Sequence, residues 1–422
     1  MDFRKQVLQY KEDIIRDLVA LLQIPSVLLE QPQSKSAPFG QGIKDSLDFM
    51  LDLGTNLGFS CENVEDIAGH IELKGKDAKE TLAILCHLDV VPAGQGWTTA
   101  PFSADIRNGR IYARGAVDDK GPTIAALYAM KIIKDLGLAP SRHIKMILGT
   151  DEETKWRGIK RYLEKFPMPE LGFAPDANFP LIYGEKGIAS FDFISENKEF
   201  DLISFTSGER YNVVPDHAEA IVKVKLEEEF AAFLKIREVQ GEIVQTGENY
   251  KYILEGIGAH AMQPHKGKNA AVFLAEFLNS HIQSPALSML SDILSDSSFQ
   301  KLGMDFSDEE MGALTMNVGV VTITKEETKI GINIRYPKGW DIQSFQRDIG
   351  KLANEYQLKT ICLSNDPVHF VDKNDSFIET LHKAYKKYTN DTTTKLMTIG
   401  GGTYARALKK AVAFGPMLPG SE

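Results

Sequence analysis

The chain has 422 residues, of which 43% are hydrophobic and 25% are charged. This composition is typical of a globular protein with two or three domains and excludes an intrinsically disordered chain. The 58 acidic residues outnumber the 48 basic ones and give a formal charge of −10, which argues against a nucleic-acid partner because phosphate contacts need a basic surface. No apolar stretch approaches the ~18 residues of a membrane span, so we expect no membrane partner.

The N-terminal segment and the cysteines indicate the cellular compartment. Residues 1–5 begin a polar, charged helical pattern and lack the apolar core of a signal peptide. The three cysteines are too few and too scattered for a disulfide framework or a cysteine–zinc module. We therefore expect a cytoplasmic protein.

Strands and helices alternate in the first part of the chain, which is typical of a parallel sheet covered by helices. Apolar residues at helical spacing predict a helix over 3–22, and a glycine–proline pair introduces a second helix over 123–136. The continuous apolar runs 82–86 and 144–148 predict strands that are buried on both faces. The expected fold class is therefore α/β, with a mostly parallel sheet flanked by helices.

The pattern changes after about residue 187 and predicts a second, inserted α+β domain. Partial alternation of apolar and polar residues at 191–194, 220–226 and 329–334 predicts sheets with one solvated face. Helical patterns at 269–282 and 342–356 separate some of these strands. The predicted organisation is a first domain over 1–187, an inserted domain over 188–383 and a return to the first domain over 384–422.

Acidic and histidine residues follow the predicted buried strands. His87 and Asp89 lie after the first strand and share one face of the extended backbone, since alternate residues point the same way. A histidine that ligates a metal commonly donates its other ring N–H to a carboxylate, and Asp89 is placed to accept it. Taken alone, the pair fits a structural hydrogen bond better than a metal site.

Three further acidic clusters have ordinary interpretations when each is taken alone. Asp118 and Asp119 precede the second predicted helix, where an N-capping aspartate with a solvated neighbour is favoured. Residues 151–153 are three adjacent carboxylates, and either solvent or a cation would offset their repulsion. The fourth cluster, around Asp176, is weak in isolation.

Together, the four clusters indicate a metal centre. The functional crevice of an open α/β sheet lies at the carboxyl ends of its strands, where three of the clusters fall. One histidine with several carboxylates suits zinc, manganese or cobalt rather than the soft metals that thiolates prefer. Several carboxylates also suit two ions about 3.5–4 Å apart that share one bridging carboxylate. We therefore expect two divalent metal ions as cofactors.

These motifs resemble those of the aminoacylase/dipeptidase family of co-catalytic zinc metallopeptidases, and the resemblance extends over essentially the whole chain. Within that family, the sequence is most similar to the PepV-type bacterial dipeptidases, which are Xaa-His or carnosinase-like dipeptidases. The motifs that carry the resemblance are His87-Leu88-Asp89-Val90-Val91-Pro92, Asp118-Asp119-Lys120-Gly121, Asp151-Glu152-Glu153, Ala174-Pro175-Asp176, Gly258-Ala259-His260-Ala261 and Gly400-Gly401-Gly402-Thr403-Tyr404-Ala405-Arg406.

The resemblance implies a ligand set for two zinc ions, with manganese or cobalt as alternatives. His87 and Asp176 would bind one ion, Glu153 would bind the other, and Asp118 would bridge both. The family also has a cis peptide bond after the bridging aspartate, here between Asp118 and Asp119. It implies that the first domain is catalytic and that the inserted domain is a lid, which takes the place of a partner subunit in a monomer.

The resemblance further implies roles in catalysis and in substrate binding. Asp89 would orient His87, and Glu152 would be the general acid/base. His260 would stabilise the oxyanion. Two residues of the inserted domain, Asn212 and Arg335, would hold the substrate carboxylate. Without this context, His260 would be interpreted as a buried histidine and Arg335 as a surface residue of a strand.

The resulting hypothesis is a cytoplasmic, metal-dependent dipeptidase of peptide catabolism, which hydrolyses dipeptides with free termini, Xaa-His or β-Ala-His among them. The alternatives are an N-acyl-amino-acid deacylase or desuccinylase with the same metals and base, and a catalytically inactive homologue. The family pattern places a last metal-binding histidine shortly after the Pro-Gly-Ser-Glu segment that here ends at Glu422. We expect this difference to reflect truncation rather than loss of the ligand.

Overall fold

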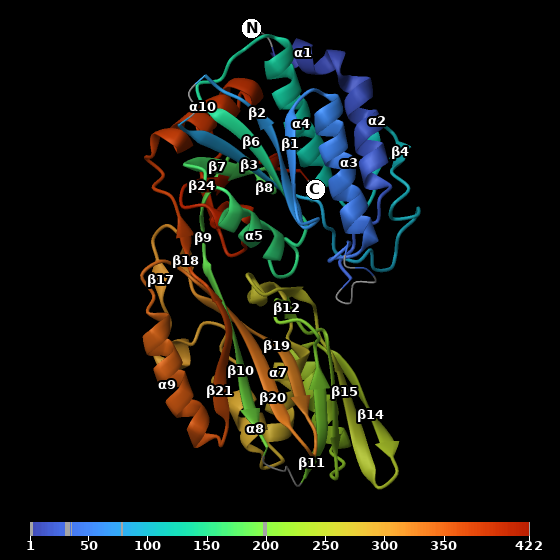
Figure 1. Ribbon diagram of the computed structural model, residues 1–422. Coiled ribbons are helices and arrows are strands. Elements are labelled where there is room, and N and C mark those ends of the chain that lie inside the picture. The colour runs from blue at the N-terminus through green and yellow to red at the C-terminus, as the bar shows by residue number, and fades with distance from the viewer. Residues whose placement is uncertain (1–2, 30–33, 35, 77–78, 197–200, 422) are drawn as a thin grey trace. The chain divides into compact units, whose positions relative to one another are not determined.

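The computed structural model describes residues 3–29, 34, 36–76, 79–196 and 201–421, which form two compact units (Figure 1). Unit 1 comprises 1–183, 371–397 and 402–422, and unit 2 comprises 184–370 and 398–401. The sequence predicted the divisions after residues 187 and 383. The second of these falls inside helix α10, Ser376–Thr389, which belongs entirely to unit 1. A continuous helix packs as one rigid element, so the division lies before it.

Unit 1 is built on a mixed sheet whose central strands are parallel. From one edge, its strands follow the order β1-β2-β6-β3-β7-β24, and the sheet continues beyond β24 with the short strands β9, Ile182–Glu185, and β22, His369–Phe370. The neighbours of β3, namely β6 and β7, run parallel to it, as β24 does to β7, whereas β2 pairs antiparallel with both β1 and β6. The bounds are Ser60–Val64 for β1, Ala68–Leu73 for β2, Thr81–His87 for β3, His143–Gly149 for β6, Leu171–Ala174 for β7 and Ala411–Ala413 for β24.

The central strands of unit 1 are buried on both faces, as the sequence predicted. On β3, Ile84 and Cys86 pack in the cluster formed with α2, α3 and α4, whereas Ala83 and Leu85 pack in the cluster formed with α5. Alternate residues of one strand therefore contact helices on opposite sides of the sheet. The helices of these two layers are α2 Lys11–Leu22, α3 Gln41–Asn56, α4 Lys120–Asp135 and α5 Arg157–Lys165.

The helix predicted over 3–22 is in fact two helices. The first, α1, is Phe3–Gln9, and it ends at Tyr10, whose backbone leaves the helical region before α2 begins. Among its described residues, α1 buries none, and Leu8 is exposed. The short elements of unit 1 are β4 Asp105–Arg107, β5 Arg110–Tyr112, β8 Ala177–Asn178, β25 Pro416–Met417 and the 3-10 turn Tyr404–Ala407.

Unit 2 contains an antiparallel sheet of eight strands. Their order is β14-β15-β13-β11-β19-β20-β10-β21, and each neighbouring pair is antiparallel. The bounds are Gly187–Ser195 for β10, Leu202–Ser207 for β11, His217–Val222 for β13, Gln240–Thr246 for β14, Asn249–Glu255 for β15, Thr315–Ile323 for β19, Thr328–Tyr336 for β20 and Lys359–Asp366 for β21.

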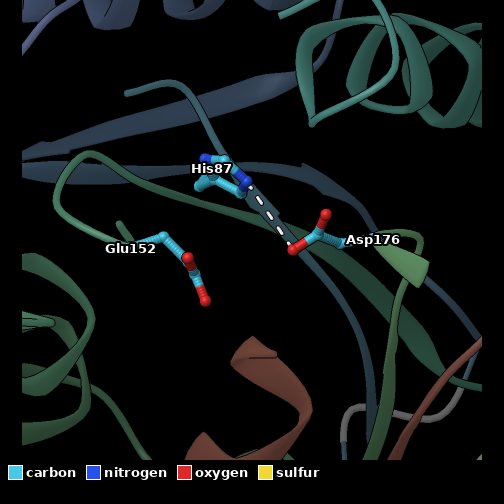
Figure 2. Close-up of side chains that lie close together, drawn as sticks. All are labelled: His87, Glu152 and Asp176. Carbon is cyan, nitrogen blue, oxygen red and sulfur yellow. Dashed lines mark ion pairs between the residues drawn. The ribbon is translucent and has the colours of Figure 1, made fainter. Parts of the chain in front are cut away.

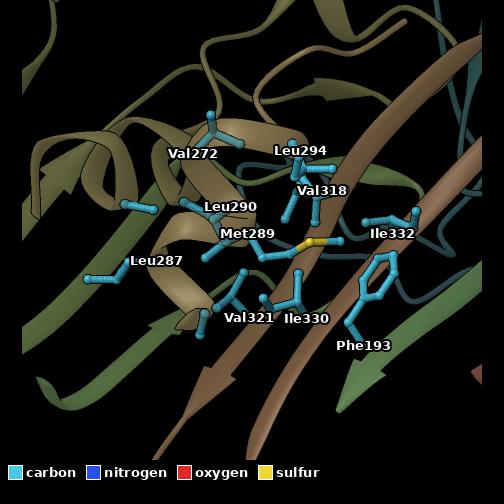
Figure 3. Packing of buried hydrophobic residues seen from close by; sticks show 14 of the residues in the cluster. Phe193, Val272, Leu287, Met289, Leu290, Leu294, Val318, Val321, Ile330 and Ile332 are labelled. Carbon is cyan, nitrogen blue, oxygen red and sulfur yellow. The ribbon is translucent and has the colours of Figure 1, made fainter. Parts of the chain in front are cut away.

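One face of this sheet carries the core of unit 2. Figure 3 shows Met289 and Leu290, from a helical segment, packed against Val321 and Ile330 of the strands. Along β13 the exposure alternates, so this strand has one solvated face as predicted, although the strand predicted over 220–226 ends at Val222. The same prediction is wrong for 329–334, because β20 is buried on both faces along most of its length. The helical elements are α6 Glu227–Arg237, α7 Ala270–Asn279, α8 Pro285–Ser288, the π-helix Met289–Ile293, α9 Ile342–Glu355 and the 3-10 turns Pro264–Lys266 and Gln300–Leu302.

Several short strands complete unit 2 and the connections between the units. Strands β9 and β23 carry the chain across the divisions after Tyr183 and Met397. None of the helices within the described residues is both long enough and apolar enough to cross a membrane. The short strands are β9 Ile182–Glu185, β12 Val213–Val214, β16 Ala259–His260, β17 Ser307–Asp308, β18 Gly312–Ala313, β22 His369–Phe370 and β23 Met397–Ile399.

A buried histidine on β2, His70, stabilises unit 1 in its neutral form. Its Nδ1 lies 3.1 Å from the hydroxyl of Tyr162, and the ring of Phe166 packs edge-on against it. Burial, reinforced by the charge of Lys145, lowers the pKa of His70 from 6.5 to about 4. The ring of His70 is therefore harder to protonate in the folded protein than in the unfolded chain.

We predict that His70 makes the stability of the protein depend on pH. The unfolded chain takes up this proton near pH 6.5 and the folded protein only near pH 4, so the contribution present at neutral pH is lost as the pH falls through this interval. The loss should reach roughly 3 kcal/mol. The free energy of unfolding in urea should therefore vary less with pH in His70→Gln than in the wild type. Replacing the exposed His265 by glutamine is the control, and equal slopes in wild type and His70→Gln would contradict the prediction.

Candidate active site

His87 ends β3 and presents a buried nitrogen to two carboxylates. Its side chain is 1% exposed, and its Nδ1 lies 2.9 Å from the backbone oxygen of Asp89. Since a carbonyl only accepts, Nδ1 carries the proton of the neutral ring and Nε2 offers a lone pair. Nε2 lies 2.8 Å from Asp118 and 3.6 Å from Asp176, yet it makes no hydrogen bond to any described residue. A buried lone pair that faces carboxylate oxygens fits a cation between them.

Asp89 acts differently from the sequence-based expectation. We expected its carboxylate to orient His87, but Oδ1 lies 3.6 Å from Nδ1 of His87, and the closer acceptor is the backbone oxygen of Asp89. The two carboxylate oxygens instead accept the backbone N–H groups of Glu152 and Glu153, each at 3.0 Å. These two N–H donors satisfy the buried carboxylate. Asp89 therefore orients His87 through its main chain and fixes the turn of both glutamates through its side chain.

Asp151 anchors the same turn from its other end, a role that the sequence analysis missed. Its buried carboxylate accepts from Nε of Arg157 at 2.6 Å, from the backbone N–H of Arg157 at 3.1 Å and from the hydroxyl of Thr154. Trp156 donates its ring N–H to the backbone oxygen of Glu152 at 2.6 Å. An aspartate followed three residues later by threonine is a local turn signal that would have pointed to this role.

The two aspartates before α4 also have different environments. The peptide bond between Asp118 and Asp119 is cis, which confirms the expectation drawn from the resemblance. The side chain of Asp118 is 61% exposed, whereas Asp119 is buried and accepts the backbone N–H of His87 at 3.2 Å. Asp119 occupies the N-cap position of α4, but its side chain makes no capping hydrogen bond, so the expected capping role is wrong. Lys120 donates to the backbone oxygens of Leu21 and Ile24, so it ties this loop to the end of α2.

The predicted metal ligands converge in two overlapping groups. Possible ligand atoms of His87, Glu152 and Asp176 lie within 4.8 Å of one another, and so do those of His87, Asp118 and Glu153. Figure 2 shows His87 facing Asp176, with Glu152 reaching toward them from its own turn. Unit 1 therefore brings together all four expected ligands and the expected base. Both glutamates occupy ligand-like positions, so their division into ligand and base stays a prediction.

The electrostatics of the cluster also fit a divalent cation. Burial and then repulsion from Asp118 raise the pKa of Glu153 to about 7 and that of Asp176 to about 6. Burial also raises the pKa of Glu152 well above its usual range. Burial disfavours the charged form of His87, but the neighbouring carboxylates of Asp118 and Asp89 raise its pKa. The cluster therefore retains protons, and a divalent cation would replace them.

Tyr404, which belongs to the glycine-rich motif at 400–406, packs against His87. Its ring meets His87 and Trp156 edge-on, with centroids 6.2 and 5.1 Å away. Its buried hydroxyl has no hydrogen-bond partner in the described parts of the chain. Gly149, at the end of β6, leaves room for this hydroxyl, because a Cβ there would lie 2.3 Å from it.

Unit 2 carries the other three predicted site residues and brings the segments of Asn212 and His260 together. Val213 pairs with His260 between β12 and β16, and the N–H of Ala261 donates to the backbone oxygen of Asn212 at 2.9 Å. Arg335 on β20 is 5% exposed, which excludes the surface-residue interpretation. Its Nη1 donates to the backbone oxygen of Gly400 at 3.0 Å. The charge of Arg335 contributes, after burial, to lowering the pKa of His260.

His260 is oriented as a neutral hydrogen-bond donor. Its side chain is exposed, which excludes the buried-histidine interpretation. The N–H of Met262 donates to Nδ1 of His260 at 3.1 Å, so in the neutral ring Nε2 carries the proton. Partial desolvation and then the charge of Arg335 lower the pKa of His260 and favour this neutral form. The ring can therefore donate from Nε2 to an oxygen that develops negative charge.

Comparisons with known proteins agree with this fold. The profile of Peptidase family M20/M25/M40 matches residues 83–421. A protein of Staphylococcus aureus strain MW2, provisionally named a dipeptidase, is 43% identical over 442 residues, which cover 100% of this chain and 93% of that protein. Human carnosine dipeptidase 1 is similar with a TM-score of 0.61 at 14% identity, and the match covers 97% of this chain and 90% of that one.

A second solved structure gives the same result. The dipeptidase Dug1p of Saccharomyces cerevisiae is similar with a TM-score of 0.58 at 14% identity, and the match again covers 97% of this chain and 90% of that one. At such identities the likeness is one of fold. It confirms the predicted α/β class, with mixed sheets and flanking helices.

We predict that binding of Zn²⁺ or Mn²⁺ weakens as the pH falls from about 8 to about 5.5. Protons then occupy Glu153 and Asp176, whose pKa values are about 7 and about 6, and compete with the cation. For each proton displaced, the dissociation constant should rise roughly tenfold per pH unit below the pKa of the group. Calorimetric titration in two buffers of different ionisation enthalpy would measure both affinity and proton release.

Two variants serve as controls for this titration. Glu153→Gln should bind more weakly and release fewer protons. Glu164→Gln, at an exposed position on α5, should match the wild type. An affinity that stays constant over the whole pH interval would contradict the assignment of these carboxylates to the metal.

Proposed function

This chain belongs to Peptidase family M20/M25/M40, and from that premise we propose that it is a metal-dependent dipeptidase that acts on short peptides with a free C-terminal carboxylate. The observation that carries the proposal is the buried Nε2 of His87, which faces carboxylates and has no hydrogen-bond partner within the described chain. The dipeptidase name of the 43% identical relative supports the substrate class. The finer assignment is to Xaa-His or β-Ala-His peptides, as in the PepV-type enzymes that the sequence resembles.

The metal centre would hold two divalent cations, zinc first and manganese or cobalt as alternatives. His87, Asp118, Glu153 and Asp176 would be the ligands, with Asp118 shared. One nitrogen donor with several carboxylates suits these ions. When bound, the cations would polarise the peptide carbonyl and lower the pKa of water.

Glu152 would be the general base and later the general acid. Its carboxylate would take a proton from the attacking water and return it to the leaving amine. Two hydrogen bonds hold the backbone of Glu152. Its N–H donates to the carboxylate of Asp89, and its carbonyl oxygen accepts from the ring N–H of Trp156. Burial raises the pKa of Glu152, which suits a group that must both accept and release a proton.

Unit 2 would recognise the substrate and stabilise the developing charge. The Nε2–H of His260 would donate to the oxyanion that forms from the peptide carbonyl. Arg335 and Asn212 would hold the C-terminal carboxylate, because the planar guanidinium matches a carboxylate with two hydrogen bonds. The guanidinium of a buried arginine has a defined orientation, and Arg335 would therefore favour substrates that end in a free carboxylate.

An N-acyl-amino-acid deacylase is the alternative that uses the same groups, because its substrates also carry a free carboxylate. The decisive experiment compares hydrolysis of β-Ala-His and of α-dipeptides with that of N-acetyl and N-succinyl amino acids in the presence of Zn²⁺ or Mn²⁺. We predict faster hydrolysis of the dipeptides, and loss of that activity on chelation. Preference for the N-acyl substrates would favour the deacylase, and failure to bind metal would favour an inactive homologue.

Replacing the base should separate catalysis from metal binding. In Glu152→Gln we predict wild-type metal stoichiometry and a kcat that is lower by roughly a hundredfold or more, the scale of lost general acid–base catalysis. In Glu153→Gln the metal occupancy itself should fall. Calorimetry and steady-state kinetics on the same preparations measure both quantities. A wild-type kcat in Glu152→Gln would rule out this base.

Replacing Arg335, the proposed partner of the substrate carboxylate, should change substrate preference. Arg335→Ala should lower kcat/KM for a free-carboxylate dipeptide by roughly a hundredfold, since a charged, bidentate interaction is lost, and should affect the C-terminal amide of the same peptide far less. Arg347→Ala, at an exposed position on α9, is the control. Equal losses on the acid and on the amide would remove Arg335 from carboxylate recognition.

A further inference from the structure

Two buried asparagines lie opposite one another in the sheet of unit 2. Asn317 on β19 and Asn333 on β20 are register partners, and they are 2% and 3% exposed. A buried amide destabilises a protein unless its donor and acceptor groups find partners. The partners of these two amides indicate what they do.

Asn333 holds the guanidinium of Arg335. The two residues are two positions apart on β20, so their side chains lie on the same face of the sheet. Nε of Arg335 donates to Oδ1 of Asn333 at 2.8 Å. The amide nitrogen of Asn333 donates in turn to the hydroxyl of Ser190 on β10 at 3.1 Å. The amide is therefore anchored to the neighbouring strand on one side and orients the arginine on the other.

A second contact fixes the plane of the same guanidinium. Nη1 of Arg335 donates to the backbone oxygen of Gly400 at 3.0 Å. Because the guanidinium is planar and rigid, hydrogen bonds at both Nε and Nη1 determine its orientation. A ligand carboxylate that pairs with this group would then meet it in one geometry, which limits the entropy lost on binding.

Asn317 holds the backbone on both sides of Asn212. Its amide nitrogen donates to the backbone oxygen of Tyr211 at 3.0 Å and to that of Val213 at 2.8 Å. Gly319, on the same strand, allows this close approach, because a Cβ there would lie 2.6 Å from Cα of Tyr211. The loop that presents the exposed Asn212 is thus attached to β19 by one buried side chain.

We infer that Asn333 and Asn317 are positioning residues of the carboxylate site: Asn333 orients Arg335, and Asn317 places Asn212. This inference rests on the proposed function, which assigns the substrate carboxylate to Arg335 and Asn212. Neither asparagine touches the substrate itself. Both act on binding of the substrate carboxylate through the residue that they hold.

The test compares a dipeptide that has a free carboxylate with the C-terminal amide of the same dipeptide. In Asn333→Ala and in Asn317→Ala, KM for the free acid should rise about tenfold, the effect of one misplaced charge-assisted hydrogen bond, while kcat changes less than twofold. The kinetics for the amide should change less than twofold. Thr328→Ala is the matched control, because Thr328 is an equally buried polar residue at the other end of β20.

A milder variant keeps the test decisive if either asparagine is needed for folding. Ser190→Ala removes one hydrogen bond from Asn333 and leaves the contact between Asn333 and Arg335 in place. KM for the free acid should rise about two- to threefold in this variant, again without a change for the amide. Thermal unfolding of every variant shows whether the fold is intact.

The possible outcomes separate this inference from the proposed function. A selective rise in KM for the free acid in the asparagine variants, or in Ser190→Ala where those do not fold, supports the inference. If the wild type hydrolyses dipeptides but the folded variants lose the same factor on acid and amide, or behave like Thr328→Ala, the inference is overturned and the proposed function stands. A wild type that hydrolyses neither peptide overturns both.

Discussion

The central constraint in this protein is the crowding of carboxylates around one buried histidine. Asp118 and Asp176 both approach Nε2 of His87, while Glu152 and Glu153 reach the same cluster from one turn. Like charges at such distances cannot all be ionised in a poorly solvated site unless positive charge lies between them. Burial first, and this repulsion second, raise the pKa values of the two glutamates and of Asp176. A divalent cation is the simplest source of that charge.

The surrounding structure divides the acidic residues into two kinds. Asp89, Asp119 and Asp151 are buried and accept hydrogen bonds from main-chain N–H groups. The protein satisfies the carboxylates of Asp89 and Asp151, whereas Oδ1 of Asp119 is buried without a hydrogen-bond partner among the described residues, and all three hold the loops in place. Others, such as Asp118 and Glu153, direct their oxygens toward the cluster. Residues adjacent in the sequence therefore differ in function because the turn gives one of them the backbone donors and leaves the other for a ligand.

Unit 2 uses the same principle with the opposite charge. A buried arginine, Arg335, is oriented by neutral partners, the amide of Asn333 and the carbonyl of Gly400. Because the guanidinium is planar, hydrogen bonds at Nε and Nη1 set the direction in which it faces an anion. In both units, hydrogen bonds to neighbouring groups orient the side chains assigned to the ligand.

The sequence alone determined the two-sided burial of the central strands of unit 1 and the positions of the chemical motifs, because apolar periodicity records which faces of an element are covered, but it did not predict that β20 is buried on both faces. The runs 82–86 and 144–148 are two-sided core strands, although the helix predicted over 3–22 breaks at Tyr10. Only the tertiary structure decided which side chains meet. Asn317 and Asn333 lie in no motif, and their partners come from other strands and loops. Such pairs depend on the register between strands and on loop paths, which local sequence does not specify.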